Sequence, residues 1–137
     1  MARASLDLIR GTLDLLILKT LTWGPLHGYS IASTIKQSTD GALLVEEGAL
    51  YPALYRMEEK GWIESEWGRS SNNRRAKYYR LTARGRQHFR NEEQTWNAYA
   101  VAVEKVLATE FRVARSSEVE KLSCYLSLRR KNHTSVL

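Results

Sequence analysis

The residues with the clearest chemical meaning form a basic run between positions 69 and 90. The run contains eight lysine or arginine side chains and no aspartate or glutamate. A positive field of this density, with no acidic residue inside the run, needs an external anion, and a polyanion fits it best. The sequence therefore predicts a nucleic-acid-binding surface built around this run.

Catalytic chemistry has much weaker support. The three histidines are scattered over a turn, a helix and the C-terminal tail, and none has a neighbour at the spacing of a metal site. Asp7 and Asp14 share one helix face without an acid–base partner, and Cys124 has no activating histidine nearby. No glycine-rich phosphate-binding loop is present. We therefore expect a protein that is not an enzyme and that uses no metal or cofactor.

Length and composition limit the class of protein. A chain of 137 residues fits one domain, or one domain with an appendage, and its formal net charge of +6 is moderately basic. The single cysteine, Cys124, excludes an intrachain disulfide and suits a reducing compartment. The apolar stretch at 13–21 is short and interrupted by polar residues, so it cannot span a bilayer. The N-terminus lacks the continuous apolar core of a signal peptide, and we expect a cytoplasmic protein without membrane contact.

Hydrophobic periodicity predicts three helices before the basic run. The first spans residues 6–22 and the second runs from residue 29 or 30 to residues 40–41, with turn chemistry between them. The third runs from about Glu47 to Lys60. Its inward positions recur at i, i+4 and i+7 and are Leu50, Leu54 and Met57. Pro52 falls near its first turn, where a missing N–H costs little, and Gly61 suits a left-handed C-cap.

The hydrophobic period then changes from helical to alternating. Residues 62–67 and 76–81 alternate as strands, and residues 68–75 supply the connecting turn. Thr82 then caps a fourth helix of about 27 residues. This order predicts a mainly α fold with a small β-hairpin, an α+β class: a winged helix-turn-helix followed by a long helix.

The fourth helix carries an apolar stripe that a compact winged domain cannot cover. Its members recur at intervals of three, four and seven and are Phe89, Trp96, Tyr99, Val103, Val106 and Leu107. An isolated stripe of this kind is usually buried by another chain, which predicts a homodimer. We therefore divide the chain into a DNA-binding domain at 1–81, a dimerisation helix at 82–110 and an unplaced tail at 111–137, with a short helix proposed at 117–131.

Four separated motifs carry a resemblance to a known family. They are Gly11–Leu18, Leu26–Tyr29, Glu47–Ile63 and Arg75–Gly85. In order and spacing they resemble the PadR family of bacterial transcriptional regulators over about residues 6–110. The resemblance implies mostly repressors that bind palindromic operators as homodimers, through a winged helix and a C-terminal dimerisation helix. A single such helix marks the smaller subfamily.

The resemblance and the helix geometry together nominate the DNA-contacting residues. On the helices these are Tyr29, Ala49, Tyr51, Pro52, Tyr55 and Arg56. In the hairpin they are Arg69, Asn72, Asn73, Arg74, Arg75 and Lys77. Position 49 commonly carries Ser or Thr in the family, so Ala49 removes a hydroxyl from the entry of the recognition helix. The alternative for the hairpin residues is a solvated turn, because Ser and Asn suit any turn.

Two alternatives concern the whole function. In the family the dimer can enclose an apolar cleft that binds flat effectors in some members, which makes Trp96 a candidate contact for a small aromatic effector. The other interpretation of Trp96 is a residue of the dimer core, in a regulator that responds to no effector. A rival from another class is a winged-helix protein-interaction module without specific DNA binding.

Overall fold

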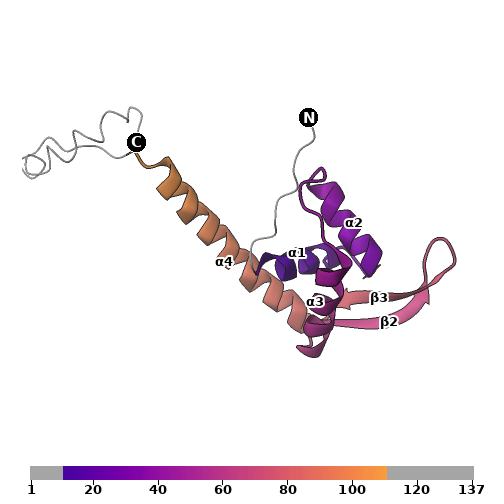
Figure 1. Ribbon diagram of the computed structural model, residues 1–137. Helices are drawn as coiled ribbons and strands as arrows, with labels where there is room; N and C mark the ends of the chain where they lie inside the picture. The colour runs from indigo at the N-terminus through magenta and orange to yellow at the C-terminus, as the bar shows by residue number, and fades with distance from the viewer. Residues whose placement is uncertain (1–10, 111–137) are drawn as a thin grey trace, which may run out of the picture. The chain divides into compact units, whose positions relative to one another are not determined.

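The computed structural model describes residues 11–110, which form four helices and a three-stranded antiparallel sheet (Figure 1). In chain order the elements are α1 (Thr12–Leu21), β1 (Leu26–His27), α2 (Gly28–Ser38), α3 (Glu47–Glu59), β2 (Ile63–Arg69), β3 (Arg75–Leu81) and α4 (Ala83–Ala108). This arrangement confirms the predicted α+β winged-helix class.

The apolar residues of α1, α2 and α3 form one core with the base of the sheet. The inward positions predicted for α3 are all buried: Leu50 and Leu54 are 1% exposed and Met57 is fully buried. Ile17 of α1 and Ile31 of α2 are also fully buried and belong to the same cluster. Helical spacing of these residues puts them on one face of each helix, so the three helices bury a common interior.

The sequence predicts the C-terminus of α3 correctly but misplaces Pro52 near its N-terminus. At the C-terminus, the N–H of Gly61 bonds to the carbonyl of Glu58 and the N–H of Trp62 bonds to that of Met57, both at 3.0 Å. With Gly61 at φ 78°, this is a Schellman cap, and the predicted left-handed glycine is confirmed. Pro52, however, is the sixth residue of α3 and lies beyond the first turn. The carbonyl of Gly48 therefore receives no helical hydrogen bond from residue 52.

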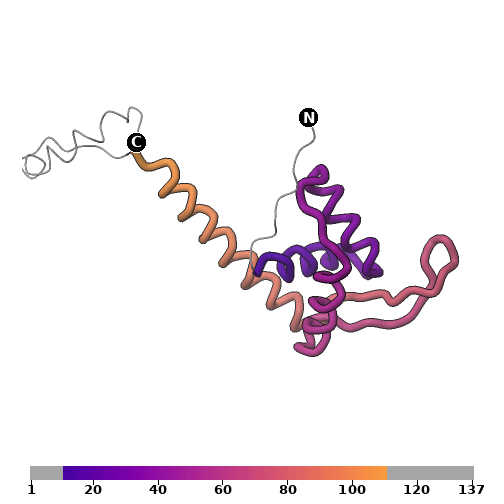
Figure 2. The backbone as a smooth tube through the Cα atoms, viewed as in Figure 1, coloured from indigo at the N-terminus to yellow at the C-terminus, as the bar shows by residue number. Residues whose placement is uncertain are grey.

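The hairpin of β2 and β3 extends away from the three helices, and the turn that joins its strands lies at the far end (Figures 1 and 2). The strands pair in register from Ile63 opposite Leu81 to Arg69 opposite Arg75. On the other side of β3, Leu26 pairs with Tyr79 and His27 with Tyr78, which gives the order β1-β3-β2. The sequence predicted only a turn at 23–28, because a two-residue strand is too short to show alternation.

The start of α4 is fixed to the winged domain. The N–H of Gly85 donates to the Thr82 hydroxyl at 2.9 Å, and that hydroxyl lies 2.6 Å from the carbonyl of Gly61. Phe89, one turn further along, is 8% exposed and belongs to the core of its own chain. The prediction that a partner chain buries Phe89 is therefore corrected: a stripe on a helix does not say which surface covers each member.

The described chain divides between Thr95 and Trp96 into two compact units, inside α4 rather than at the predicted boundary of 81/82. The first unit extends into α4 because Phe89 packs in its core. None of the helices described between residues 11 and 110 is long and apolar enough to cross a bilayer. The short helix proposed at 117–131 lies outside the described residues, as does Cys124.

Candidate nucleic-acid interface

An open groove of about 940 Å³ lies between the helices and the hairpin. It is lined by the N-terminus of α2, by α3 and by the segment from β2 through β3, which we call the wing (residues 63–81). Six of the residues predicted to contact DNA line this groove: Tyr29, Tyr51, Asn72, Arg74, Arg75 and Lys77. The groove therefore brings together residues from the helix-turn-helix and from the wing that are far apart in the sequence.

The N-terminus of α2 is capped by a histidine. The N–H of Ser30 donates to Nδ1 of His27 at 3.3 Å, so His27 satisfies one of the free N–H groups at the helix start. Gly28 follows, and a Cβ added there would overlap the Tyr51 hydroxyl. The missing side chain lets Tyr51 lie across the start of α2 while it stays 44% exposed to the groove. Tyr29, beside it, is 75% exposed.

The other predicted residues of α3 have different surroundings. Ala49 and Pro52 are exposed, as expected for the outer face of the helix entry. Tyr55 is also exposed, and its hydrogen bond to the Glu59 carboxylate raises the pKa of its phenol above the usual value. Arg56 donates to the Asp14 carboxylate at 2.6 Å, which ties α3 to α1. Because its guanidinium is engaged with α1, we leave Arg56 out of the proposed DNA contacts.

Alternation along β3 separates the two neighbouring tyrosines. Tyr79 is 5% exposed and faces the core, and burial raises the pKa of its phenol, with a smaller contribution from the Glu58 carboxylate. Tyr78 lies on the outer face, where its hydroxyl donates to the carbonyl of Arg69 at 2.9 Å. Lys77 shares the inner face with Tyr79, and its Nζ lies 5.9 Å from that ring.

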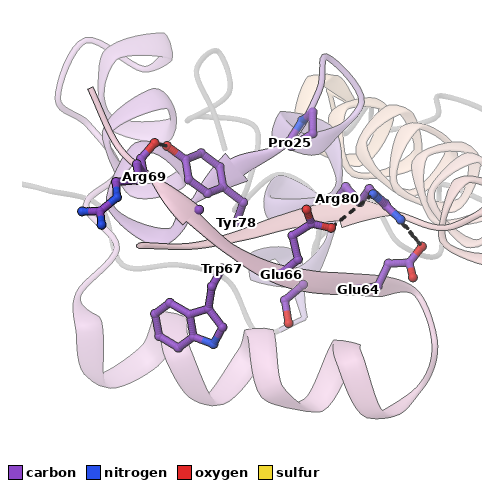
Figure 3. A pocket seen from close by; sticks show the side chains of 9 residues that line it. Pro25, Glu64, Glu66, Trp67, Arg69, Tyr78 and Arg80 are labelled. Atoms are coloured by element: carbon purple, nitrogen blue, oxygen red, sulfur yellow. Dashed lines mark hydrogen bonds and ion pairs between the residues drawn. The ribbon is translucent and has the colours of Figure 1, made fainter. Parts of the chain in front are cut away.

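The acidic residues that precede the basic run supply part of its countercharge. Arg80 lies opposite Glu64 in the strand register and contacts its carboxylate at 3.2 Å, with that of Glu66 at 3.9 Å (Figure 3). Lys77 lies 4.0 Å from the Glu58 carboxylate of α3. The expectation of a run without internal countercharge is therefore wrong for these two residues, because strand pairing brings β2 against β3.

Uncompensated positive charge is left at the wing tip, residues 69–75. Among the residues that the structure describes, no carboxylate lies within ion-pair distance of Arg69, Arg74 or Arg75. The outer face of the wing differs: a second hollow of about 360 Å³ there is lined by two arginines, Arg69 and Arg80, and by two acids, Glu64 and Glu66 (Figure 3). The charge pattern therefore favours an anion at the tip and on the groove side, rather than on the outer face.

The two asparagines of the wing tip also shape its turn. Asn73 adopts a left-handed conformation with φ 62°, which asparagine tolerates better than most residues, and its N–H bonds to the carbonyl of Ser70 at 2.8 Å. The Ser70 hydroxyl donates to the Asn72 side-chain oxygen at 2.6 Å. Both asparagines are exposed, so they keep a position from which DNA contact is feasible while they serve as turn residues.

The distal part of α4, described by itself, keeps an exposed apolar stripe. Tyr99, Val106 and Leu107 are 59%, 72% and 78% exposed, while Trp96 and Val103 are half-buried. The rings of Trp96 and Tyr99 lie 6.0 Å apart. Positions 96, 99, 103 and 106 alternate by three and four, which is the spacing of a coiled-coil seam.

Among the groove-lining residues that sequence reasoning missed are His27 and Trp67. His27 looked like part of a turn, although its place just before a helix start is typical of a cap. Trp67 pairs with Lys77, so the two side chains lie on the same face of the hairpin. The alternation of residues 62–67 could have indicated this face. Over residues 11–110, no cluster of three histidine, cysteine or acidic side chains could hold a metal ion.

The comparisons with known proteins agree with this geometry. A model of the transcriptional regulator PadR-like family matches residues 17–91. A protein of Lysinibacillus sphaericus, itself described only as uncharacterized, is 33% identical over 90 residues, which cover 66% of this chain and 83% of that protein. The solved structure of a transcriptional regulator from Clostridium thermocellum is similar, with a TM-score of 0.65 and 33% identity, over 71% of this chain and 94% of that one. A PadR family regulator from Clostridium difficile gives a TM-score of 0.63 and 32% identity, over 72% and 100% of the two chains.

Proposed function

We propose a specific role for this chain, which belongs to the PadR-like family of transcriptional regulators: it is a homodimeric repressor that binds an inverted-repeat operator. The coarser statement follows from the family, whose members are DNA-binding transcriptional regulators rather than enzymes. The finer one, which includes repression, the dimer and the operator, is our proposal.

One observation carries the proposal: the groove between the exposed start of α3 and the unpaired arginines of the wing tip. In a winged helix-turn-helix, the recognition helix enters the major groove and reads base edges, and basic side chains hold the phosphates. Here Ala49, Tyr51 and Pro52 are exposed at the start of α3. Of these three, Tyr51 lines the groove, and Arg74 and Arg75 line it from the wing. We assign the exposed residues at the start of α3 to base and sugar contacts, and the two wing arginines to the DNA backbone or minor groove.

The proposed dimer rests on the distal half of α4. Exposed Tyr99 and Val106 lie on the seam with Trp96 and Val103, and exposed Leu107 borders it. A second copy of the same helix covers such a seam in an isologous dimer, which presents two recognition helices to DNA. Two-fold symmetry then predicts an inverted repeat with half-site centres about 34 Å apart, one helical turn.

Repression and its control are the remaining parts of the proposal. A dimer bound over a promoter blocks transcription without further machinery, so repression is the simplest outcome. Trp96 and Tyr99 place two aromatic rings on the proposed dimer seam. A flat aromatic effector that stacks on Trp96 would change the spacing of the two winged domains. Such a regulator works in the cytoplasm, where its operator is.

Selection of bound duplexes from a random-sequence library tests the operator. The purified full chain is incubated with duplexes that carry a randomised 30-base-pair centre, and the bound fraction is sequenced over successive rounds. We expect an enriched inverted repeat whose half-sites lie about one turn apart. Enrichment of a single half-site would contradict the dimer, and retention of duplexes without any enrichment would contradict specific binding.

A further inference from the structure

The face of the wing that lines the groove changes from apolar to cationic along its length. Because side chains alternate along a strand, the pairs Ile63–Leu81, Ser65–Tyr79, Trp67–Lys77 and Arg69–Arg75 share this face. The first pair is buried in the core, whereas Trp67 is 55% exposed. Trp67 therefore lies where the core ends and the cationic tip begins.

Trp67 has a cation over its ring. The Cζ atom of Arg75 lies 4.3 Å from the centroid of the Trp67 ring system. Trp67 pairs with Lys77 across the strands, so Arg75 is its diagonal neighbour on the same face, within reach of a long side chain. The negative face of an indole attracts a guanidinium, and the two flat groups fit against each other.

This contact orders Arg75 without using its hydrogen-bond donors. A guanidinium carries five N–H groups, all at its edge, and a ring that touches its face leaves them available. Two other arginines of the wing, Arg80 and Arg69, do use their donors. Arg80 donates to the Glu64 carboxylate at 3.2 Å, and Arg69 donates to the carbonyl of Asn73 at 3.2 Å. Within residues 11–110, the Arg75 side chain makes no ion pair, so it is held in place and still able to bind.

We propose that Trp67 is a positioning residue that presents the edge of the Arg75 guanidinium to the minor groove of DNA beside each half-site. This inference rests on the proposed function. A narrow minor groove, as in an A-tract, carries an enhanced negative potential that attracts arginine. A side chain already fixed before binding loses less conformational freedom when it enters the groove. The Trp67–Arg75 pair thereby gives the protein a preference for A·T-rich sequence at positions flanking the major-groove contacts.

Fluorescence anisotropy with two labelled 30-base-pair duplexes tests the inference. Both duplexes carry the inverted repeat enriched in the selection described above, flanked by A-tracts in one duplex and by mixed sequence in the other. We expect the wild-type chain to prefer the A-tract duplex. W67A should weaken binding to it by about two- to fivefold, the worth of an exposed cation–π contact. W67F, which keeps an aromatic face, should retain most of the affinity, and R75K, which keeps the charge but not the flat fork, should lose the A-tract preference.

The double variant separates positioning from folding. If Trp67 acts through Arg75, W67A should change affinity little when it is added to R75A, because the group that it positions is absent. An equal loss with and without Arg75, or no loss at all, would overturn the inference while DNA binding stands. A wild-type chain that binds neither duplex would overturn the proposed function itself. An NMR spectrum of the free protein gives an independent readout, since the Arg75 Nε proton should shift upfield under the indole ring and lose this shift in W67L.

Discussion

Neighbouring basic side chains in the wing have different roles because their partners differ. Arg80 faces two carboxylates of β2, whereas Arg74 at the turn has no carboxylate within ion-pair distance among the described residues. A cation that is already paired releases fewer counterions when DNA binds, because its field is partly cancelled. The net charge of the run therefore overstates the number of side chains available for phosphate.

The first prediction compares these two arginines. Arg74→Ala should weaken binding to every duplex alike and lower the salt slope by about one for each phosphate that a protomer no longer neutralises. Arg80→Ala is the matched control, since it removes the same charge from the same hairpin but a charge that β2 already balances. Titration of a labelled mixed-sequence duplex between low and moderate salt gives both slopes. An equal reduction of the salt slope in the two variants would show that pairing with Glu64 and Glu66 does not keep Arg80 from neutralising phosphate.

A second prediction concerns Glu58, the acid of α3 that lies beside Lys77. Glu58 accepts a hydrogen bond from the Ser65 hydroxyl at 2.7 Å and lies 4.0 Å from Lys77. Glu58→Gln keeps an oxygen for Ser65 but removes the charge that balances Lys77. We expect tighter binding to mixed-sequence DNA and a steeper salt slope, by up to about one per protomer. An unchanged slope in the same anisotropy assay would show that Lys77 does not reach phosphate.

At the scale of elements, local patterns predicted the helices well and the contacts between strands poorly. The buried faces of α1, α2 and α3 repeat every three or four residues, and one helix is enough to show this period. Glu64 and Arg80 lie on different strands, so their pairing depends on the strand register. The composition of the basic run does not give that register. Phe89 belongs to the same helical stripe as Trp96, yet Phe89 is buried in the core of its own chain. An apolar stripe indicates that its residues need to be buried, but it does not indicate which surface buries each of them.

Two helical glycines give a prediction at this scale with an internal control. A Cβ at Gly85, in the first turn of α4, would overlap the backbone carbonyl of Trp62, which cannot move aside as a flexible side chain would. Gly85→Ala should therefore destabilise the protein by about 1–3 kcal/mol, as overpacking does. Gly48 in α3 has nothing within 4 Å of the same position. Gly48→Ala should stabilise by about 0.5–1 kcal/mol, the helix propensity difference.

Urea unfolding followed by circular dichroism measures both glycine variants. The two substitutions add the same methyl group to a helix, so opposite signs isolate the effect of the Trp62 carbonyl. A Gly85→Ala protein as stable as wild type would mean that the start of α4 can move away from the turn after α3. The junction between the winged domain and α4 would then be less rigid than its hydrogen bonds to Thr82 indicate.

At the scale of the whole molecule, the proposed function depends on two copies acting together. One winged domain offers a single recognition helix, and a half-site alone carries too little information to find an operator among many competing sites. The distal half of α4 is the part of the described chain with exposed apolar residues at coiled-coil spacing. Its dimerisation should therefore be coupled directly to specific DNA binding, and protein concentration should affect both.

The last prediction tests this coupling with two aspartates placed on different sides of the same helix. Val103 lies on the seam with Trp96 and Tyr99, whereas Val101, 52% exposed, lies two residues away on the opposite side of α4. Val103→Asp should yield a monomer, since a buried unpaired charge is costly, and Val101→Asp should stay dimeric. Sedimentation velocity gives the mass, and binding to an inverted repeat against its single half-site gives the function. The monomeric variant should bind the inverted repeat and the single half-site with the same low affinity. Its circular dichroism spectrum should be unchanged, because the winged domain stays folded. A Val103→Asp protein that stayed dimeric and preferred the repeat would place the interface away from this face of α4.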